Sequence, residues 1–490
     1  MKKIYKILLI TLLVLIIVIA GILFTQTGND LVKPYLKAEL EKQIGLPVEV
    51  DTFKLRYDHT LLKLVIDKGL KVDVASAFNL LTQSFDGTYK VGAKNFIYEG
   101  LSLDQANING EFKGVPDDLR VNGKGTSFNA PLTYDLRVVE GEAQEITFYI
   151  KALKLSDIFA LAKQPALAKG LVEANLTIPT LVKDKLAADV NINLSDVTFN
   201  DALMKKIYNI SLPEAFLLQG NIDAKMREKN VIGSVTMQSD IADVNLSAVN
   251  VDMQSKHISA EYLINILDLK SLSSLLHTKV DGLLVLKGKV EKTDTLKVTG
   301  STDSLGGKVK YALANKDFTA KLSAMPMQNM LKMFQFPAFI DANTTGELHY
   351  NLATKQGHSA LALADFKLAS NKVTQSLGAV MPINPTDIIF GETSFDANIS
   401  GDEVIYTLIA KASEASITIG EGRINKEKDT HEAKMEFGFN KYAIAGSIGG
   451  SIRKPRIGFD TKGFLKDQML ENNFLERAED KVKKFFKRLF

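Results

Sequence analysis

The chain has 490 residues, no cysteine and a formal net charge of +3, with 46% hydrophobic and 24% charged residues. This composition is typical of a folded chain, and it excludes disulfides, a thiolate nucleophile, a cysteine-ligated zinc and an acylated lipoprotein cysteine. The small net charge provides no general surface for nucleic acid, so we predict no nucleic-acid partner.

The first feature along the chain is an apolar segment, Ile7–Phe24, that contains no charge. About 18 such residues at about 1.5 Å per residue just span a hydrocarbon core of about 30 Å. Lysines precede the segment and Asn29 and Asp30 follow it, which places the N-terminus in the cytoplasm. A cleaved signal peptide is the alternative, but the apolar run is longer than a signal peptide needs, and the small pair Ala20-Gly21 is followed by Ile22, Leu23 and Phe24, which suit a signal peptidase poorly. The predicted anchor residues are Ile7, Leu8, Leu12, Leu15, Ile16, Ile19 and Phe24.

From Leu46 onward the dominant pattern is the alternation of apolar and polar residues. Val48 and Val50 begin it, and the stretches 146–150, 190–194 and 417–419 repeat it. Every second side chain of a strand points to the same face, so this pattern predicts strands with one dry and one wet face. We therefore predict an all-β protein.

Few segments have helical spacing. One predicted helix begins at Asn29 or Asp30 and ends at Gln43, with Gly45 just past its end. A second runs from Ser156 to Lys163.

Short apolar segments followed by a glycine recur at intervals of about 57 residues, which indicates an array of stacked units. Coincidence is the alternative, because β-rich chains produce spaced glycines freely. The segments begin at Leu155, Leu212, Leu269, Met327 and Asn384.

The tail from Gly463 to Phe490 has helical periodicity and ends in a cluster of basic residues. Such a basic amphipathic helix is typical of a membrane surface. The alternative is a helix that caps the end of the sheet, with lysines favoured near its C-terminus by the helix dipole. The residues predicted to contact the membrane are Phe474, Val482, Lys483, Lys484, Phe485, Phe486, Lys487 and Arg488.

Catalytic motifs are missing from the sequence. The six histidines are scattered, and the nearest pair, His349 and His358, lies in alternating segments typical of surface strands. No nucleophile elbow, phosphate-binding loop or metalloprotease motif occurs. We therefore predict no catalytic site, no metal and no cofactor, and a binding or structural role instead of an enzyme.

Leu31–Val50 has the pattern of a helix followed by a glycine and a first strand, and Gly446–Asp460 has that of a glycine-led strand pair containing a proline. These two stretches flank the alternating region and resemble a known family, the AsmA-like proteins of Gram-negative envelopes. The resemblance implies an elongated, curved and open taco-like β-groove of repeated antiparallel units. It also implies inner-membrane anchoring, with the bulk of the chain in the periplasm. The implied function is the transport of phospholipid or another envelope lipid in outer-membrane biogenesis. The implied partners at the C-terminal end are the outer membrane or an envelope protein.

These inferences divide the chain into an anchor (1–28), a periplasmic β-groove (29–462) and a terminal amphipathic helix (463–490). A competing hypothesis is a scaffold whose β units bind another envelope protein through strand edges. A periplasmic hydrolase is less favoured because no catalytic constellation is present. The residues predicted to line the groove are Leu283, Val285, Leu361, Leu363 and Phe395.

Overall fold

The computed structural model describes residues 24–460, except 80, 99–100, 181–185, 212–215, 274, 277, 371–373, 376–377, 379–383 and 441. The predicted C-terminal helix and all of the predicted anchor but Phe24 lie outside the described residues. Phe24 is partly exposed in a turn, where its carbonyl accepts a hydrogen bond from Arg56 Nη1 at 3.1 Å. None of the helices within the described part combines the length and hydrophobicity needed to cross a bilayer.

The described residues form mainly β-structure, with four α-helices and two 3₁₀ helices among them. The strands are β1 (Val48–Leu55), β2 (His59–Ile66), β3 (Leu70–Asn79), β4 (Ser84–Tyr98), β5 (Leu101–Val115), β6 (Asp118–Ser127), β7 (Ala130–Val139), β8 (Glu142–Lys154), β9 (Ala168–Thr180), β10 (Ala187–Phe199), β11 (Leu217–Arg227), β12 (Asn230–Ser239), β13 (Ala242–Asp252), β14 (His257–Ile266), β15 (Leu284–Lys292), β16 (Leu296–Thr302), β17 (Lys308–Ala314), β18 (Asp317–Pro326), β19 (Ile340–Asn351), β20 (Gln356–Leu368), β21 (Glu392–Ser400), β22 (Glu403–Lys411), β23 (Ala415–Asn425), β24 (Thr430–Phe439), β25 (Tyr442–Ser451) and β26 (Lys454–Phe459). The helices are α2 (Gln26–Ile44), α3 (Leu155–Leu161), α4 (Asp201–Tyr208), η2 (Lys270–Leu272), α5 (Met327–Met333) and η3 (Pro385–Asp387).

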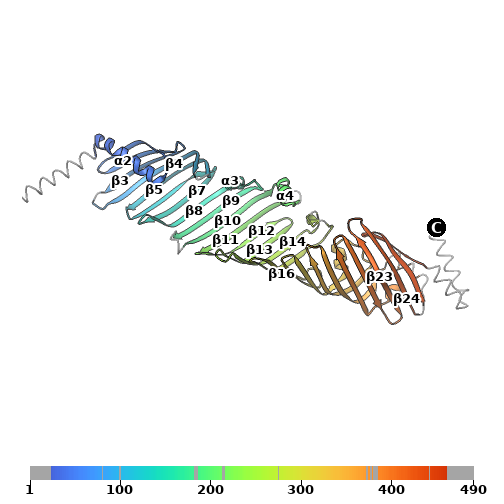
Figure 1. Cartoon of the computed structure of the whole chain (residues 1–490). Helices are drawn as coiled ribbons and strands as arrows, with labels where there is room; N and C mark the ends of the chain where they lie inside the picture. Colours follow the sequence, from blue (N-terminus) through green and yellow to red (C-terminus); the bar gives the residue numbers. More distant parts are fainter. Residues whose placement is uncertain are drawn as a thin grey trace, which may run out of the picture. The chain divides into compact units, whose positions relative to one another are not determined.

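The chain divides into two compact units. The first unit comprises Met1–Ser239 and Asn250–Gln254, and the second comprises Asp240–Val249 and Ser255–Phe490. Within the first unit each strand from β1 to β12 pairs antiparallel with the next one along the chain, as Figure 1 shows for β7 to β12. Within the second unit the same is true from β14 to β26. In neither unit does a pairing of described residues join the last strand to the first, so the predicted all-β fold with open antiparallel sheets is confirmed.

Helix α2 confirms the first predicted helix, with a different N-terminus. Thr25, not Asn29, is the N-cap and accepts a hydrogen bond from the Gly28 amide, while Gly45 ends the helix at φ 73°. Asn29 is instead 2% exposed, and its side-chain amide binds both backbone groups of Leu55, at 2.6 and 3.2 Å. The helix therefore packs on one end of the first sheet.

Four strands share one irregularity near one end, a β-bulge with a non-glycine residue at positive φ. In β18, for example, Leu322 and Met325 are both buried although they are three residues apart, because Ala324 between them has φ 48°. The bulge inserts an extra residue and increases the local twist, so both side chains reach the same face. The four inward pairs are Ile150 with Leu153, Leu194 with Val197, Leu322 with Met325, and Leu363 with Phe366, and the bulged residues are Ala152, Asp196, Ala324 and Asp365.

Three of the bulged strands lead directly into short helices. Strand β8 continues into α3, β10 into α4 and β18 into α5. Helices α3 and α4 lie along the same margin of the first sheet (Figure 1). Helix α3 confirms the helix predicted over Ser156–Lys163, whereas α4 was not predicted.

The predicted repeat has helices at four of its expected positions, but the number of strands between them varies. Helices α3, η2, α5 and η3 lie at four of the five expected positions, and the fifth, at Leu212, lies outside the described residues. Of the four intervals between these positions, two contain four strands each. The other two contain only two strands each, because β9, β10, β19 and β20 have 12 or 13 residues each. The structure therefore does not confirm a repeated unit of uniform strand number.

Candidate functional site

One face of the first sheet is apolar across its whole width. Cross-strand partners from β2 to β12 line up in a row that contains only apolar residues and one glycine. Leu64, Leu132 and Ile150 in this row are buried, and the other side chains remain partly exposed. The row is Leu64, Val72, Val91, Ile108, Gly125, Leu132, Ile150, Ala174, Ile192, Ile222 and Val235.

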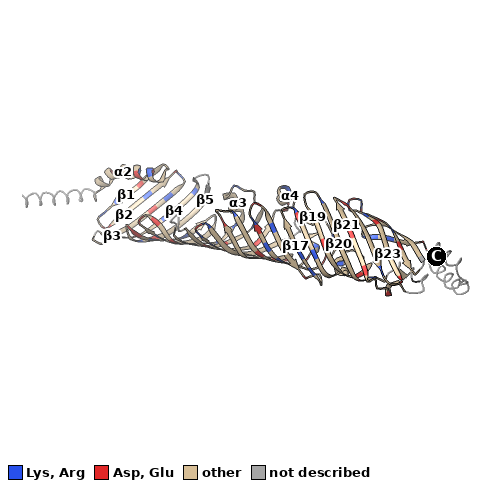
Figure 2. Ribbon diagram, turned by 60° about the horizontal axis from the view of Figure 1, so that its bottom comes forward, with Lys and Arg blue, Asp and Glu red and all other residues tan. Residues whose placement is uncertain are grey.

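The opposite face of the same strands is polar. The neighbouring row contains lysine, aspartate, asparagine, threonine, serine and tyrosine, and no aliphatic residue. Cross-strand ion pairs such as Arg120–Asp135 at 3.0 Å and Arg137–Asp118 at 2.6 Å are exposed to solvent on this side. Figure 2 shows basic and acidic residues interspersed along the strands. The row is Lys63, Asp73, Lys90, Asn109, Lys124, Thr133, Tyr149, Asn175, Asn191, Asp223 and Ser234.

A tyrosine pair bridges the apolar face of the first unit. Tyr89 on β4 and Tyr134 on β7 occupy the ends of an in-register row whose two middle positions are Gly110 and Gly123. Because these glycines have no side chains, the rings extend over them and the two hydroxyls form a hydrogen bond. The Tyr89 hydroxyl also donates to the carbonyl of Asn122 at 2.8 Å, so Tyr134 is the donor within the pair.

The second unit contains the same arrangement. Tyr262, Gly288, Gly300 and Tyr311 form an in-register row over β14 to β17, and the two hydroxyls are 2.8 Å apart. The Tyr262 hydroxyl donates to the carbonyl of Thr299 at 3.1 Å, as Tyr89 does to Asn122. Burial and the hydrogen bond to the partner tyrosine raise the pKa of Tyr311 well above its usual value. Both units therefore place a tyrosine bridge on the same face as the aliphatic residues.

The predicted lining residues divide between the two faces of the second sheet. Leu361 and Phe395 are direct cross-strand partners on the face that carries Tyr311, and Leu363 on the same face is 2% exposed. Leu283, just before β15, is 66% exposed, and Val285 is 38% exposed and lies on the other face. At β15 the apolar face is formed by Leu284 and Leu286 instead, because these residues lie on the same face as Gly288 of the tyrosine row.

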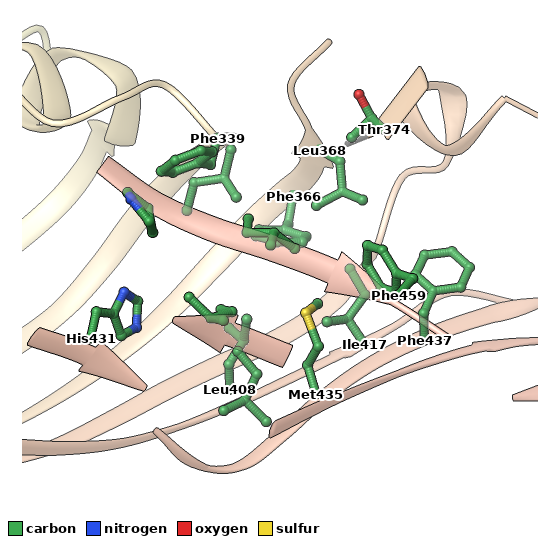
Figure 3. A pocket seen from close by; sticks show the side chains of 15 residues that line it. Phe339, Phe366, Leu368, Thr374, Leu408, Ile417, His431, Met435, Phe437 and Phe459 are labelled. Carbon is green, nitrogen blue, oxygen red and sulfur yellow. The ribbon is translucent and has the colours of Figure 1, made fainter. Parts of the chain in front are cut away.

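A partly open apolar cavity of about 140 Å³ lies in the second unit. Phe366 and Phe437, with exposures of 1% and 0%, belong to its wall, and Phe366 packs edge-to-face on Phe390 with ring centroids 5.5 Å apart. Figure 3 shows the aromatic and aliphatic side chains converging, with Phe459 at one margin and His431 at the other. The lining residues are Phe339, Ile340, Phe366, Leu368, Thr374, Leu408, Ile417, Ile419, His431, Met435, Phe437, Ile448, Pro455, Ile457 and Phe459.

His431 is the titratable group of this wall. Its Nε2 lies 2.7 Å from the hydroxyl of Tyr406, whose ring stacks on Phe395 at 5.5 Å. Burial lowers the pKa of His431 and raises that of Tyr406 to about 12. At neutral pH the imidazole is therefore neutral, and the cavity wall carries no net charge from this pair.

The polar face provides no constellation for catalysis among the residues that the structure describes. His349 and His358 are direct cross-strand partners there, but their nearest polar contacts are Glu347 at 3.7 Å and Asn398 at 3.1 Å respectively. Across the described ranges, no three His, Asp or Glu side chains gather closely enough to hold a metal ion.

Sequence reasoning missed the two tyrosine rows and the cavity. The rows have a signal in the sequence, because each glycine occupies a position where alternation demands an inward side chain. The cavity has none, since its wall combines residues from β19, β20 and each strand from β22 to β26 with connecting segments. No protein-family model matches this chain, and no curated protein matches it.

Proposed function

We propose that this chain binds the hydrocarbon chains of phospholipid or another envelope lipid on the apolar face of its sheets and lets them pass along it. The observation that supports this proposal most is the in-register apolar row from β2 to β12, most of whose side chains remain partly exposed. The protein is a lipid-binding element of outer-membrane biogenesis, anchored in the inner membrane by Ile7–Phe24, and not an enzyme.

The physical argument concerns the uncovered apolar surface. Soluble monomers rarely expose a contiguous apolar patch larger than a few hundred Å². The helices of the first unit contact the sheet at β1, β8 and β9, whereas partly exposed apolar residues continue over the intervening strands. A lipid acyl chain laid on this face gains about 0.8 kcal/mol for each methylene removed from water.

The polarity of the two faces suits an amphiphile in water. The polar face carries ion pairs and amides that remain solvated, so the sheet is soluble on that side. The arrangement of anchor, post-anchor helix and β-rich body is also the one that the resemblance to AsmA-like proteins implies. That resemblance supports the location and the lipid class of the proposal.

The proposal is tested by extracting the full chain in a mild non-ionic detergent and identifying co-purified lipids by mass spectrometry. The informative variant is Ile108→Asp, which places a charge in the middle of the apolar row. The matched control is Asn109→Asp, the adjacent residue of β5, which is exposed on the polar face. Circular dichroism establishes that both variants retain their β-structure.

We expect phospholipid with the wild type and with Asn109→Asp, and a severalfold lower amount with folded Ile108→Asp. A folded wild-type protein without lipid contradicts the proposal. If the same lipid-free preparation captures one envelope protein by crosslinking, the scaffold hypothesis replaces it.

A further inference from the structure

A second pocket of about 920 Å³ in the second unit is lined by basic side chains. Lys279, Lys426 and Arg453 contribute to its wall, together with one carboxylate, Asp429. Asp429 accepts a hydrogen bond from the Ile452 amide at 3.2 Å, which fixes this carboxylate at the turn between strands. Among the described residues no carboxylate lies within ion-pair distance of the three cations. The pocket therefore has a net positive charge.

Arg453 is held in place by two contacts. Its Nη1 donates to the carbonyl of Phe334 at 2.6 Å, and its guanidinium lies 5.2 Å from the centroid of the Phe336 ring. A guanidinium fixed over an aromatic face keeps donors for a carboxylate or phosphate and loses little entropy when it binds one. The two lysines are exposed and add unpaired charge.

The rest of the wall is mainly apolar, with Ser273 and Thr278 as its polar members, and it adjoins the apolar cavity. Val404 and Ile424 line the basic pocket, and the next partner in their row is His431, which lines the cavity. The two linings also meet at the turn between β25 and β26. Ile452 and Arg453 in this turn line the basic pocket, whereas Ile448 on β25 and Pro455 on β26 line the cavity. The basic pocket and the apolar cavity are thus neighbours, and β22 and β23 contribute side chains to both.

We propose that this combination is a fixed site for an anionic amphiphile, with its phosphate or carboxylate bound by Lys279, Lys426 and Arg453 and its hydrocarbon in the adjoining cavity. This inference rests on the proposed function and adds a preference for anionic over zwitterionic head groups. A cavity of about 140 Å³ is similar to engineered apolar cavities that bind benzene, so it accommodates a short stretch of chain. The remainder of the hydrocarbon lies on the apolar face.

The test uses the full chain in non-ionic detergent and counts bound lipid by native mass spectrometry. The probes are phosphatidylglycerol and phosphatidylcholine with identical acyl chains, and inorganic phosphate as a competitor. The variant is Lys279→Gln with Lys426→Gln, at two exposed positions whose substitution preserves the fold. The control is Lys297→Gln with Lys434→Gln, which removes two exposed charges outside the pocket.

We expect the wild type and the control to prefer phosphatidylglycerol at least fivefold, about 1 kcal/mol. The pocket variant should lose this preference and still bind phosphatidylcholine as the wild type does. Equal binding of both lipids by the wild type, or an unchanged preference in the pocket variant, overturns this inference and leaves the proposed function intact. Full displacement of phosphatidylglycerol by millimolar phosphate assigns the site to a free anion and also overturns it. Absence of both lipids from the wild type contradicts the proposed function itself.

Discussion

The hydroxyl of Tyr262 lies 2.8 Å from that of Tyr311, although two strands, β15 and β16, separate the two residues along the sheet. The distance is bridged because Gly288 and Gly300 occupy the positions between them. Tyr89 and Tyr134 repeat the relationship over Gly110 and Gly123 in the first unit. Aromatic rings that cover strand glycines replace the packing that the missing side chains would supply.

The two hydroxyls of the Tyr262–Tyr311 pair should differ in their contribution to stability. Tyr262→Phe leaves both the Thr299 carbonyl and the Tyr311 hydroxyl without their partner, so we expect a cost of about 1–3 kcal/mol. Tyr311→Phe leaves the bond from Tyr262 to Thr299 intact and should cost about 0.5–1.5 kcal/mol. Hydrogen exchange of the β15 and β16 amides measures the loss of stability in each variant. Strands β4 to β7 serve as the internal control, and equal effects of the two variants would contradict the assignment of donors.

Gly288 should tolerate no side chain. A Cβ there would collide with the Thr299 carbonyl oxygen and lie 2.6 Å from the Cα of Gly300. We expect Gly288→Ala to destabilise the second unit by about 1–3 kcal/mol. Gly420→Ala is the matched control, since a Cβ at Gly420 meets no atom within 4 Å. Urea unfolding followed by tyrosine fluorescence compares the two, and similar midpoints would show that the sheet relaxes around the added methyl group.

Asn29 should fix helix α2 to the end of β1. Replacement by alanine leaves the partly buried amide and carbonyl of Leu55 without their partner, so we expect a local cost of about 1–3 kcal/mol. The measurement is the exchange rate of the Leu55 amide, with Gln26→Ala in the exposed first turn of the same helix as the control. Unchanged protection of Leu55 in Asn29→Ala would mean that water replaces the side chain.

The second unit should lose stability as the pH falls below about 6.5. Burial lowers the pKa of His431 in the folded state, so the unfolded imidazole takes up a proton first. Stability therefore falls below the unfolded pKa and levels off below the folded one. His431→Gln should flatten this dependence, whereas His349→Gln, at an exposed position, should preserve it. Exchange of the β24 amides across the pH series provides the measurement, and an unchanged slope in His431→Gln would assign the effect to another group.

Alternation in the sequence predicted most of the fold because each strand has one apolar face. Val48 and Val50 are 2% and 5% exposed, in agreement with the alternation from Leu46 onward. The prediction placed Val285 of β15 on the apolar face, whereas the structure places it on the opposite one. Leu283, Leu284, Val285 and Leu286 form a continuous apolar run here. A run without polar residues does not distinguish the two faces, and the row containing Gly288 decides between them.

The β-bulges limited the prediction in a different way. Leu363 and Phe366 are 2% and 1% exposed and three residues apart, a spacing that would place them on opposite faces of a regular strand. The extra residue, Asp365 at φ 53°, has no sequence signature because it is not a glycine. Residues that follow a bulge therefore appear to alternate on the wrong face until the bulge is known.

The succession of neighbouring strands also determines how the chain can fold. From β1 to β12, and again from β14 to β26, each strand pairs only with the strands before and after it. Such topology has a low contact order within each unit, because no pairing waits for a distant segment. A strand can add to the growing sheet as soon as its residues become available, and its neighbour then offers a template for the next. Assembly of each unit is thus a propagation from strand to strand that needs no long-range loop closure.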